Sequence, residues 1–118
     1  MTDVMKSALD KYTEFISSLN GVLKIYLFGS YARGDADKRS DIDLMVIVDD
    51  SLDPLKMAYR IQVGLSEIDV ESDASFEEIM NEPALDIIVN RKTAFEEASG
   101  VDFFQREVLE TGELIYAK

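Results

Sequence analysis

The apolar residues of the chain recur with two different periods, which divide it into helices and strands. Over residues 3–19 they stand three and four positions apart, which is the spacing of one face of an α-helix. This helix is expected to end at Asn20 and Gly21, since both residues favour helix termination. Its apolar stripe is expected to pack into the core, and comprises Val4, Ala8, Leu9, Tyr12, Phe15, Ile16 and Leu19.

Three short apolar runs have the length and the boundaries of β-strands. They cover residues 22–28, 42–48 and 84–90. A fourth, shorter strand is expected over residues 113–116, after a stop at Gly112.

Helix-start signals occupy the segments between these strands. Asp53 followed by Pro54 is an N-cap with proline at the first helical position. Ser75 and Thr93 each stand three residues before a glutamate, which is the pattern of a capping box. The helices expected from these signals and from apolar spacing cover residues 53–65, a short piece at 75–78, a helix opening over 93–96, and residues 102–111.

The order of these elements places the chain in the α/β (α+β) class. Helices and strands alternate, which predicts a short mixed sheet flanked by helices. The pattern does not choose the order or the direction of the strands. A length of 118 residues fits one domain spanning residues 1–118, with no repeat and no linker.

Composition removes several classes of function. The chain has no Cys and no His, which excludes disulfides, thiolate zinc sites and a histidine base. Any metal must then be bound by oxygen, which selects ions such as Mg²⁺, Mn²⁺ or Ca²⁺. The net charge of −12 repels phosphate backbones, so broad nucleic-acid binding is not expected. No apolar run is long enough for a membrane span, and a cytoplasmic location is expected.

Two aspartates stand at the entry to the strand at residues 42–48. Side chains two positions apart in a strand point to the same face, with Cα atoms about 6.6 Å apart, so Asp41 and Asp43 project side by side. Like charges so close disfavour joint ionisation, and a divalent cation reverses that preference. The alternative is a polar strand end that faces water, and this pair alone does not decide between them.

Two further features suit the same chemistry. Gly29 and Ser30 interrupt an apolar strand, where glycine lets a phosphate approach the backbone. Ser30 is expected to cap a short helix or to contact a phosphate oxygen. Asp86 opens an apolar strand, and it completes a three-carboxylate cluster if that strand lies beside residues 42–48. The alternatives are a plain turn and an edge-strand aspartate in water.

Metal-assisted transfer of a nucleoside monophosphate explains these features together. Two Mg²⁺ ions about 3.5–4 Å apart, bridged by carboxylates, can hold a nucleoside triphosphate and stabilise an in-line displacement. Asp41, Asp43 and Asp86 are therefore the expected metal ligands and catalytic residues. Asp86 is expected to help remove the proton of the attacking hydroxyl, and Gly29 and Ser30 to hold the distal phosphates.

The segment from Leu27 to Gly34, followed by Arg39 to Leu44, resembles the signature of the polymerase β-like nucleotidyltransferase superfamily. It is most similar to the minimal nucleotidyltransferases (MNT), whose pattern is Gly-Ser, ten residues, then Asp-x-Asp. Residues 31–40 supply the ten-residue spacing here. Arg33 belongs to the signature, and it either neutralises phosphate or pins the loop through an acidic neighbour.

The resemblance implies a polymerase β-like fold and the use of ATP with Mg²⁺, or with Mn²⁺. Many such proteins are antitoxins paired with a HEPN toxin, which they block by adenylylating a tyrosine. The acceptor site is then completed by the partner or by a second copy of the chain.

Two alternatives stay open for this function. One is a non-catalytic module that covers the toxin, and the other is a homodimeric adenylyltransferase of small molecules. The acidic stretch 66–83 matches the family poorly, and within it Glu71 and Asp73 are rival third carboxylates.

Overall fold

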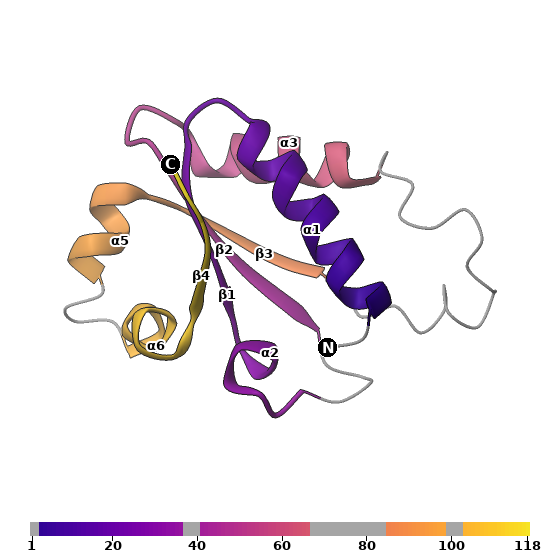
Figure 1. Cartoon of the computed structure of the whole chain (residues 1–118). Helices are drawn as coiled ribbons and strands as arrows, with labels where there is room; N and C mark the ends of the chain where they lie inside the picture. Colours follow the sequence, from indigo (N-terminus) through magenta and orange to yellow (C-terminus); the bar gives the residue numbers. More distant parts are fainter. Residues whose placement is uncertain (1–2, 37–40, 67–84, 99–102) are drawn as a thin grey trace.

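The computed structural model describes residues 3–36, 41–66, 85–98 and 103–118 (Figure 1). The short helix expected at residues 75–78 therefore lies outside the described residues. Helices and strands otherwise follow the expected order: α1 (Asp3–Ser18), β1 (Val22–Phe28), α2 (Ser30–Arg33), β2 (Ile42–Val48), α3 (Pro54–Ser66), β3 (Leu85–Arg91), α5 (Lys92–Ala98), α6 (Phe103–Thr111) and β4 (Glu113–Ala117).

The four strands form one mixed sheet in the order β3-β2-β1-β4. Strand β2 runs parallel to β3, whereas β1 runs antiparallel to both β2 and β4. The predicted short mixed sheet is confirmed. Its strand order, which the apolar pattern does not give, places β3 directly beside β2.

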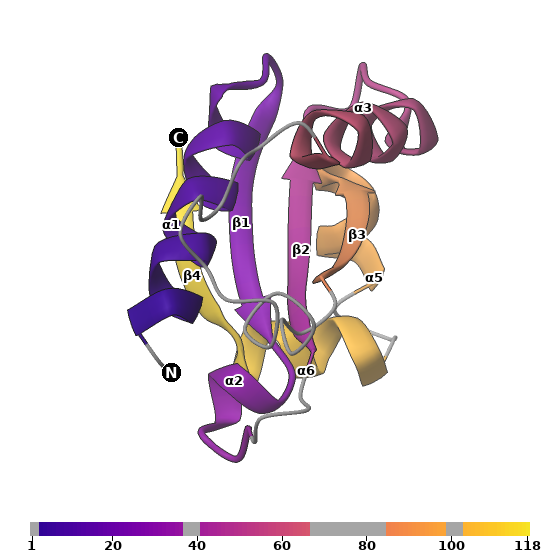
Figure 2. The same cartoon turned by 90° about the vertical axis from the view of Figure 1, so that its right-hand side faces the viewer.

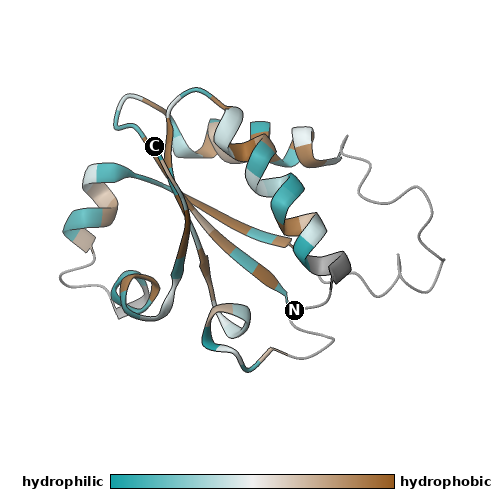
Figure 3. Ribbon diagram, viewed as in Figure 1, coloured by the Kyte–Doolittle hydropathy of each residue, from teal (hydrophilic) through white to brown (hydrophobic). Residues whose placement is uncertain are grey.

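Helices cover both faces of the sheet, with α1 and α3 on one face and α5 and α6 on the other (Figures 1 and 2). Alternate residues of β2 belong to the two faces, so this central strand is apolar on both sides. Figure 3 shows apolar residues along the strands, with polar residues gathered on the helices. The first core cluster contains Leu9, Ile16, Val22, Ile25, Leu27, Ile42, Leu44, Val46, Val48, Met57 and Ile61. The second contains Tyr26, Phe28, Met45, Ile47, Phe95 and Val108.

The N-cap predicted before α3 is confirmed. The Asp53 carboxylate accepts hydrogen bonds from the backbone N–H of Leu55 at 2.9 Å and of Lys56 at 3.4 Å. These bonds satisfy two of the donors that a helix start leaves unpaired, so the helix begins at Pro54. Within the described ranges, no helix combines the length and apolar character needed to cross a bilayer.

The capping box predicted at Thr93 is wrong. Strand β3 extends to Arg91 and α5 begins at Lys92, so Thr93 already lies inside the helix. Its N–H and hydroxyl both donate to the Asp50 carboxylate, the former at 2.9 Å. Asp50 lies in the turn that follows β2. The Asp50 carboxylate, from a distant segment, thus accepts the hydrogen bonds of the first turn of α5. The pattern of residues along the chain does not reveal such a contact.

Candidate active site

The strand register brings two of the expected carboxylates side by side. Asp43 on β2 is paired with Asp86 on β3 and, on its other side, with Phe28 on β1. Paired residues of neighbouring strands point to the same face, and such strands lie about 4.8 Å apart. The strand placement on which the role of Asp86 depended is therefore present.

Asp41 immediately precedes β2, and strand alternation places it on the same face as Asp43. That face carries Met45 further along β2, which packs with the residues of α5 and α6. Asp41 and Asp86 are exposed, whereas Asp43 between them is half-buried. We call these three residues the carboxylate site.

The electrostatics of the carboxylate site centre on Asp43. Burial raises the pKa of Asp43 above its ordinary value, and the negative charges of Asp86 and Asp41 raise it further. The Arg33 guanidinium acts in the opposite direction and lowers this pKa. A second positive charge placed among the three carboxylates would therefore relieve a repulsion that the fold imposes.

The donor set suits a hard divalent cation, because every side chain that could bind it offers carboxylate oxygens. Among the described residues, however, no three acidic side chains are gathered closely enough to form a ready-made metal site. The backbones of Asp43 and Asp86 are already aligned, so only rotation about their side-chain bonds is needed to bring the carboxylate oxygens together. Asp41, Asp43 and Asp86 could hold the ion after such a rotation.

Gly29 lies against the half-buried carboxylate. Its φ is +76°, and a Cβ atom at this position would lie 2.3 Å from Oδ2 of Asp43. Only glycine meets both conditions, since an L side chain rarely adopts this φ and the space is filled by the carboxylate. The apolar strand β1 therefore ends in a turn that brings backbone next to Asp43.

The expectation that Ser30 caps a helix is wrong. Gly29 is the N-cap of α2, without a side-chain cap, and Ser30 is the first helical residue. The turn at Gly29 occurs one residue earlier than expected, so the Ser30 side chain no longer lies at the capping position. The carbonyl oxygen of Ser30 instead accepts hydrogen bonds from the N–H of Gly34 and of Asp35, at 3.0 and 3.1 Å.

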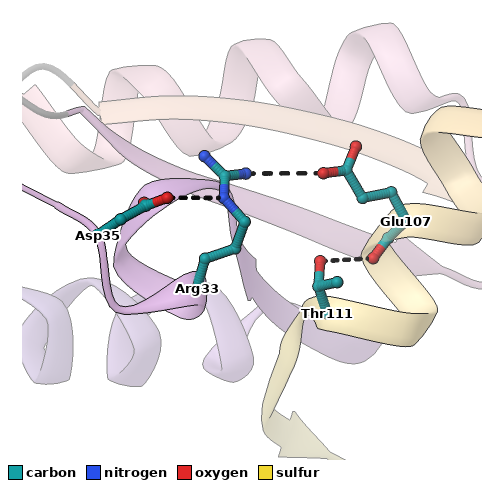
Figure 4. Close-up of polar contacts among 4 residues, drawn as sticks. All are labelled: Arg33, Asp35, Glu107 and Thr111. Carbon is teal, nitrogen blue, oxygen red and sulfur yellow. Dashed lines mark hydrogen bonds and ion pairs between the residues drawn. The ribbon is translucent and has the colours of Figure 1, made fainter.

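Arg33 pins the loop through acidic neighbours, which is one of its two expected roles. Its guanidinium lies 3.3 Å from Asp35 and 3.6 Å from Glu107 on α6 (Figure 4). A pocket of about 120 Å³ adjoins this bridge and is lined by Phe28, Gly29, Arg33, Glu107, Val108 and Thr111. Sequence analysis missed Glu107, because nothing in its local pattern indicates a contact with the distant loop.

Several other residues considered from the sequence have no structural outcome. Arg39, with which the second part of the signature begins, lies outside the described residues. The same holds for Glu71 and Asp73, the rival third carboxylates. Among the described residues, the carboxylate of β3 in register with Asp43 is that of Asp86.

The sequence of the chain matches a known protein family and its members. The family model described as nucleotidyltransferase domain matches residues 9–109. A protein named as a candidate protein adenylyltransferase from Methanocaldococcus jannaschii is 32% identical over 113 residues, covering 87% of this chain and 92% of that protein. A second protein of the same name and organism is 42% identical over 55 residues, or 47% of this chain and 55% of that protein.

Solved structures share the fold at lower identity. A candidate nucleotidyltransferase from Sulfolobus solfataricus aligns over 100% of this chain and 90% of its own, with a TM-score of 0.56 and 18% identity. A toxin–antitoxin structure with AMP-PNP aligns over 96% of this chain and 73% of its own, with a TM-score of 0.53 and 22% identity. The mixed sheet and its flanking helices are thus the fold of these chains.

Proposed function

Because the chain belongs to the nucleotidyltransferase domain family and is a nucleotidyltransferase, we propose that it transfers AMP from ATP to a hydroxyl group of a partner protein. The alignment of Asp43 with Asp86, beside the turn at Gly29, is the observation that carries this proposal. It supports a shared cation site next to backbone that a phosphate can approach.

The positions of the residues support the following roles. Asp41, Asp43 and Asp86 would hold Mg²⁺, or Mn²⁺, and the bound ion would offset the charge of the triphosphate and acidify the acceptor hydroxyl. Gly29 and Ser30 would hold the distal phosphates at the start of α2. Arg33 is close enough to lower the pKa of Asp43, so it also adds positive charge at this edge of the site.

The transfer is an in-line displacement at the α-phosphorus of ATP. The acceptor oxygen forms a bond to that phosphorus, and the bond from the phosphorus to the oxygen bridging to the β-phosphate breaks. Pyrophosphate leaves with the electron pair of the broken bond. Asp86, the exposed member of the aligned pair, would receive the proton of the acceptor and release it to solvent.

A toxin is the proposed acceptor protein. The relatives are named as candidate protein adenylyltransferases, and solved toxin–antitoxin structures share the fold, which supports a toxin as the protein that is modified. Resemblance to the MNT proteins adds that the toxin is of the HEPN type and that the acceptor is a tyrosine. The chain would then act as the antitoxin.

Labelled ATP tests this function. The chain is incubated with Mg²⁺ or Mn²⁺ and with the protein encoded in the adjacent reading frame, and ATP carries its label at the α- or the γ-phosphate. We expect label on that protein from α-labelled ATP alone, and none with the double variant Asp41→Ala/Asp43→Ala. The matched control removes two exposed charges from α1, as Asp10→Ala/Glu14→Ala, and should remain active. Absence of label from α-labelled ATP on that protein, with Mg²⁺ and with Mn²⁺, would sink the proposal.

A further inference from the structure

Helix α3 has apolar residues on two sides, although the fold uses only one. Met57 and Ile61 are buried in the first core cluster, together with residues of the sheet and of α1. Leu55, Tyr59 and Val63 point away from that core and are 81%, 73% and 42% exposed. Residues four apart lie along one ridge of a helix, so these three form a continuous strip, which we call the α3 ridge.

The α3 ridge is more than a scatter of exposed apolar residues. Single exposed hydrophobic residues are ordinary on protein surfaces, whereas contiguous ones mark interaction sites. Here a leucine and a tyrosine expose most of their surface next to each other on a regular helix. Packing of α3 against the sheet does not require them, because Met57 and Ile61 already supply its inner face.

The charge beside this ridge is opposite in sign to that of the whole chain. Lys56 and Arg60 follow Leu55 and Tyr59 by one residue, and both are exposed. Helix α3 contains no aspartate or glutamate, although the chain has a net charge of −12. Neither Lys56 nor Arg60 takes part in an ion pair among the described residues. The ridge is thus an apolar strip with a cationic edge on an acidic protein.

This combination distinguishes between the surfaces that could cover the ridge. A two-fold contact between copies brings the same surface of both chains together, and helix α3 offers no carboxylate to pair with Lys56 or Arg60. Two chains of charge −12 also repel each other over their whole surfaces, and an extended anionic membrane repels the chain in the same way, whereas a single helix meets only the cationic edge of α3. A helix of another protein, with its own apolar ridge flanked by carboxylates, satisfies both the apolar strip and the cations.

We propose that the α3 ridge, with Lys56 and Arg60, is the docking surface for an acidic amphipathic helix of the partner protein. This docking proposal rests on the proposed function only where it identifies the partner with the protein that receives the nucleotide. Helix α3 packs on β3, the strand that carries Asp86, from the face opposite to α5 and α6 (Figure 2). The carboxylate site lies on the other face of the sheet, so a partner docked on α3 would reach it around the edge strand β3.

Site-specific photo-crosslinking in the cells of origin tests this docking surface. Tyr59 is replaced by p-benzoylphenylalanine, and an otherwise identical chain carries that residue at Glu14, which is exposed on α1. Mass spectrometry then identifies the adduct and maps the crosslinked peptide. We expect one partner protein crosslinked at position 59 above the level at position 14, through a peptide in which apolar residues alternate with Asp or Glu at helical spacing.

Charge reversal provides the second arm. The double change Lys56→Glu/Arg60→Glu leaves the apolar ridge intact and should lower the affinity for the crosslinked partner at least tenfold. Lys6→Glu, an exposed cation on α1, should leave it unchanged. Crosslinking to a second copy or to lipid, no adduct above the control, or an adduct insensitive to charge reversal would each overturn the docking surface. The isolated charge-reversed chain should still bind ATP. If the unaltered chain docks with its partner but transfers no label, that result contradicts the proposed activity and leaves the docking surface standing.

Discussion

The Asp43 carboxylate fills the space that a side chain at position 29 would need: a Cβ atom on Gly29 would lie 2.3 Å from Oδ2 of Asp43. Asp43 lies on β2, and Gly29 directly follows Phe28, the residue of the antiparallel strand β1 that is paired with Asp43. The turn that ends β1 therefore fixes where the half-buried carboxylate can point. The Gly-Ser and Asp-x-Asp parts of the sequence form one structural unit.

Substitution of Gly29 by Ala should harm both stability and the site. An Ala with φ +76° and ψ −154° costs about 1–3 kcal/mol, and the new methyl group also displaces the Asp43 carboxylate. Gly34→Ala is the matched control, because its φ is +84° with no atom within 4 Å of an added Cβ. Both variants should lose stability in denaturant titrations. Only Gly29→Ala should lose affinity for ATP with Mg²⁺, by about 10–100-fold; equal affinities would contradict the coupling.

Removal of the Asp43 charge should stabilise the metal-free chain at neutral pH. The pKa of Asp43 is raised above its ordinary value of 3.8, so the folded chain holds this proton more tightly than the unfolded chain. Stability from this group is present below pH 3.8 and is lost as the pH rises through the folded pKa. Asp43→Asn should therefore raise Tm at pH 7 but not at pH 3.

A control for Asp43→Asn is needed because any lost acid relieves repulsion in a chain of charge −12. Asp10→Asn on the exposed side of α1 removes the same charge far from the carboxylate site. Its effect on Tm at pH 7 should be smaller than that of Asp43→Asn. Equal shifts would mean that Asp43 is not held in an unfavourable position.

The neighbours of Asp43 should move its pKa in opposite directions. Asp86→Asn removes a negative charge and should lower the pKa of Asp43, whereas Arg33→Gln removes a positive charge and should raise it. Carboxyl chemical shifts followed by NMR over pH measure both changes. Changes of the same sign in the pKa of Asp43 would be inconsistent with this arrangement.

Global stability should change by less than about 1 kcal/mol in Arg33→Gln, because the ion pairs of Arg33 with Asp35 and Glu107 are exposed.

Asp50 should stabilise the fold without affecting the chemistry. Its pKa is lowered, first by the hydroxyl and then by the N–H of Thr93, which both donate to it. This stabilisation is present above pH 3.8 and is lost as the pH falls through the lowered folded pKa. Thermal melts should show a lower Tm for Asp50→Asn at pH 7 and a smaller difference in acid. ATP binding should be unchanged, and a loss of binding would place Asp50 in the site.

The elements were predictable where local signals act alone. Apolar periodicity predicted the strands and the first and last helices, and Asp53 with Pro54 marked the start of α3. The contacts between Thr93 and Asp50 and between Arg33 and Glu107 were not predictable, because each joins segments that only the folded sheet brings together. The same applies to strand order, which decides whether Asp86 belongs to the site.

The candidate site divides in the same way. Spacing along the chain indicated Asp41 and Asp43, since alternation in one strand is a local property. The place of Asp86 depended on which strand lies beside β2, and the register settles that alignment. Gly29 was expected to admit phosphate, whereas its contact with the Asp43 carboxylate became visible only across two strands.

Cation binding by the carboxylate site is the claim on which the account depends. Isothermal titration of Mn²⁺ into the chain, in the presence of a non-hydrolysable ATP analogue, measures it without an acceptor protein. We expect about two ions per chain, with binding lost in Asp43→Asn and retained in Asp10→Asn. Unchanged Mn²⁺ binding in Asp43→Asn, or no binding to the unaltered chain, would contradict the account.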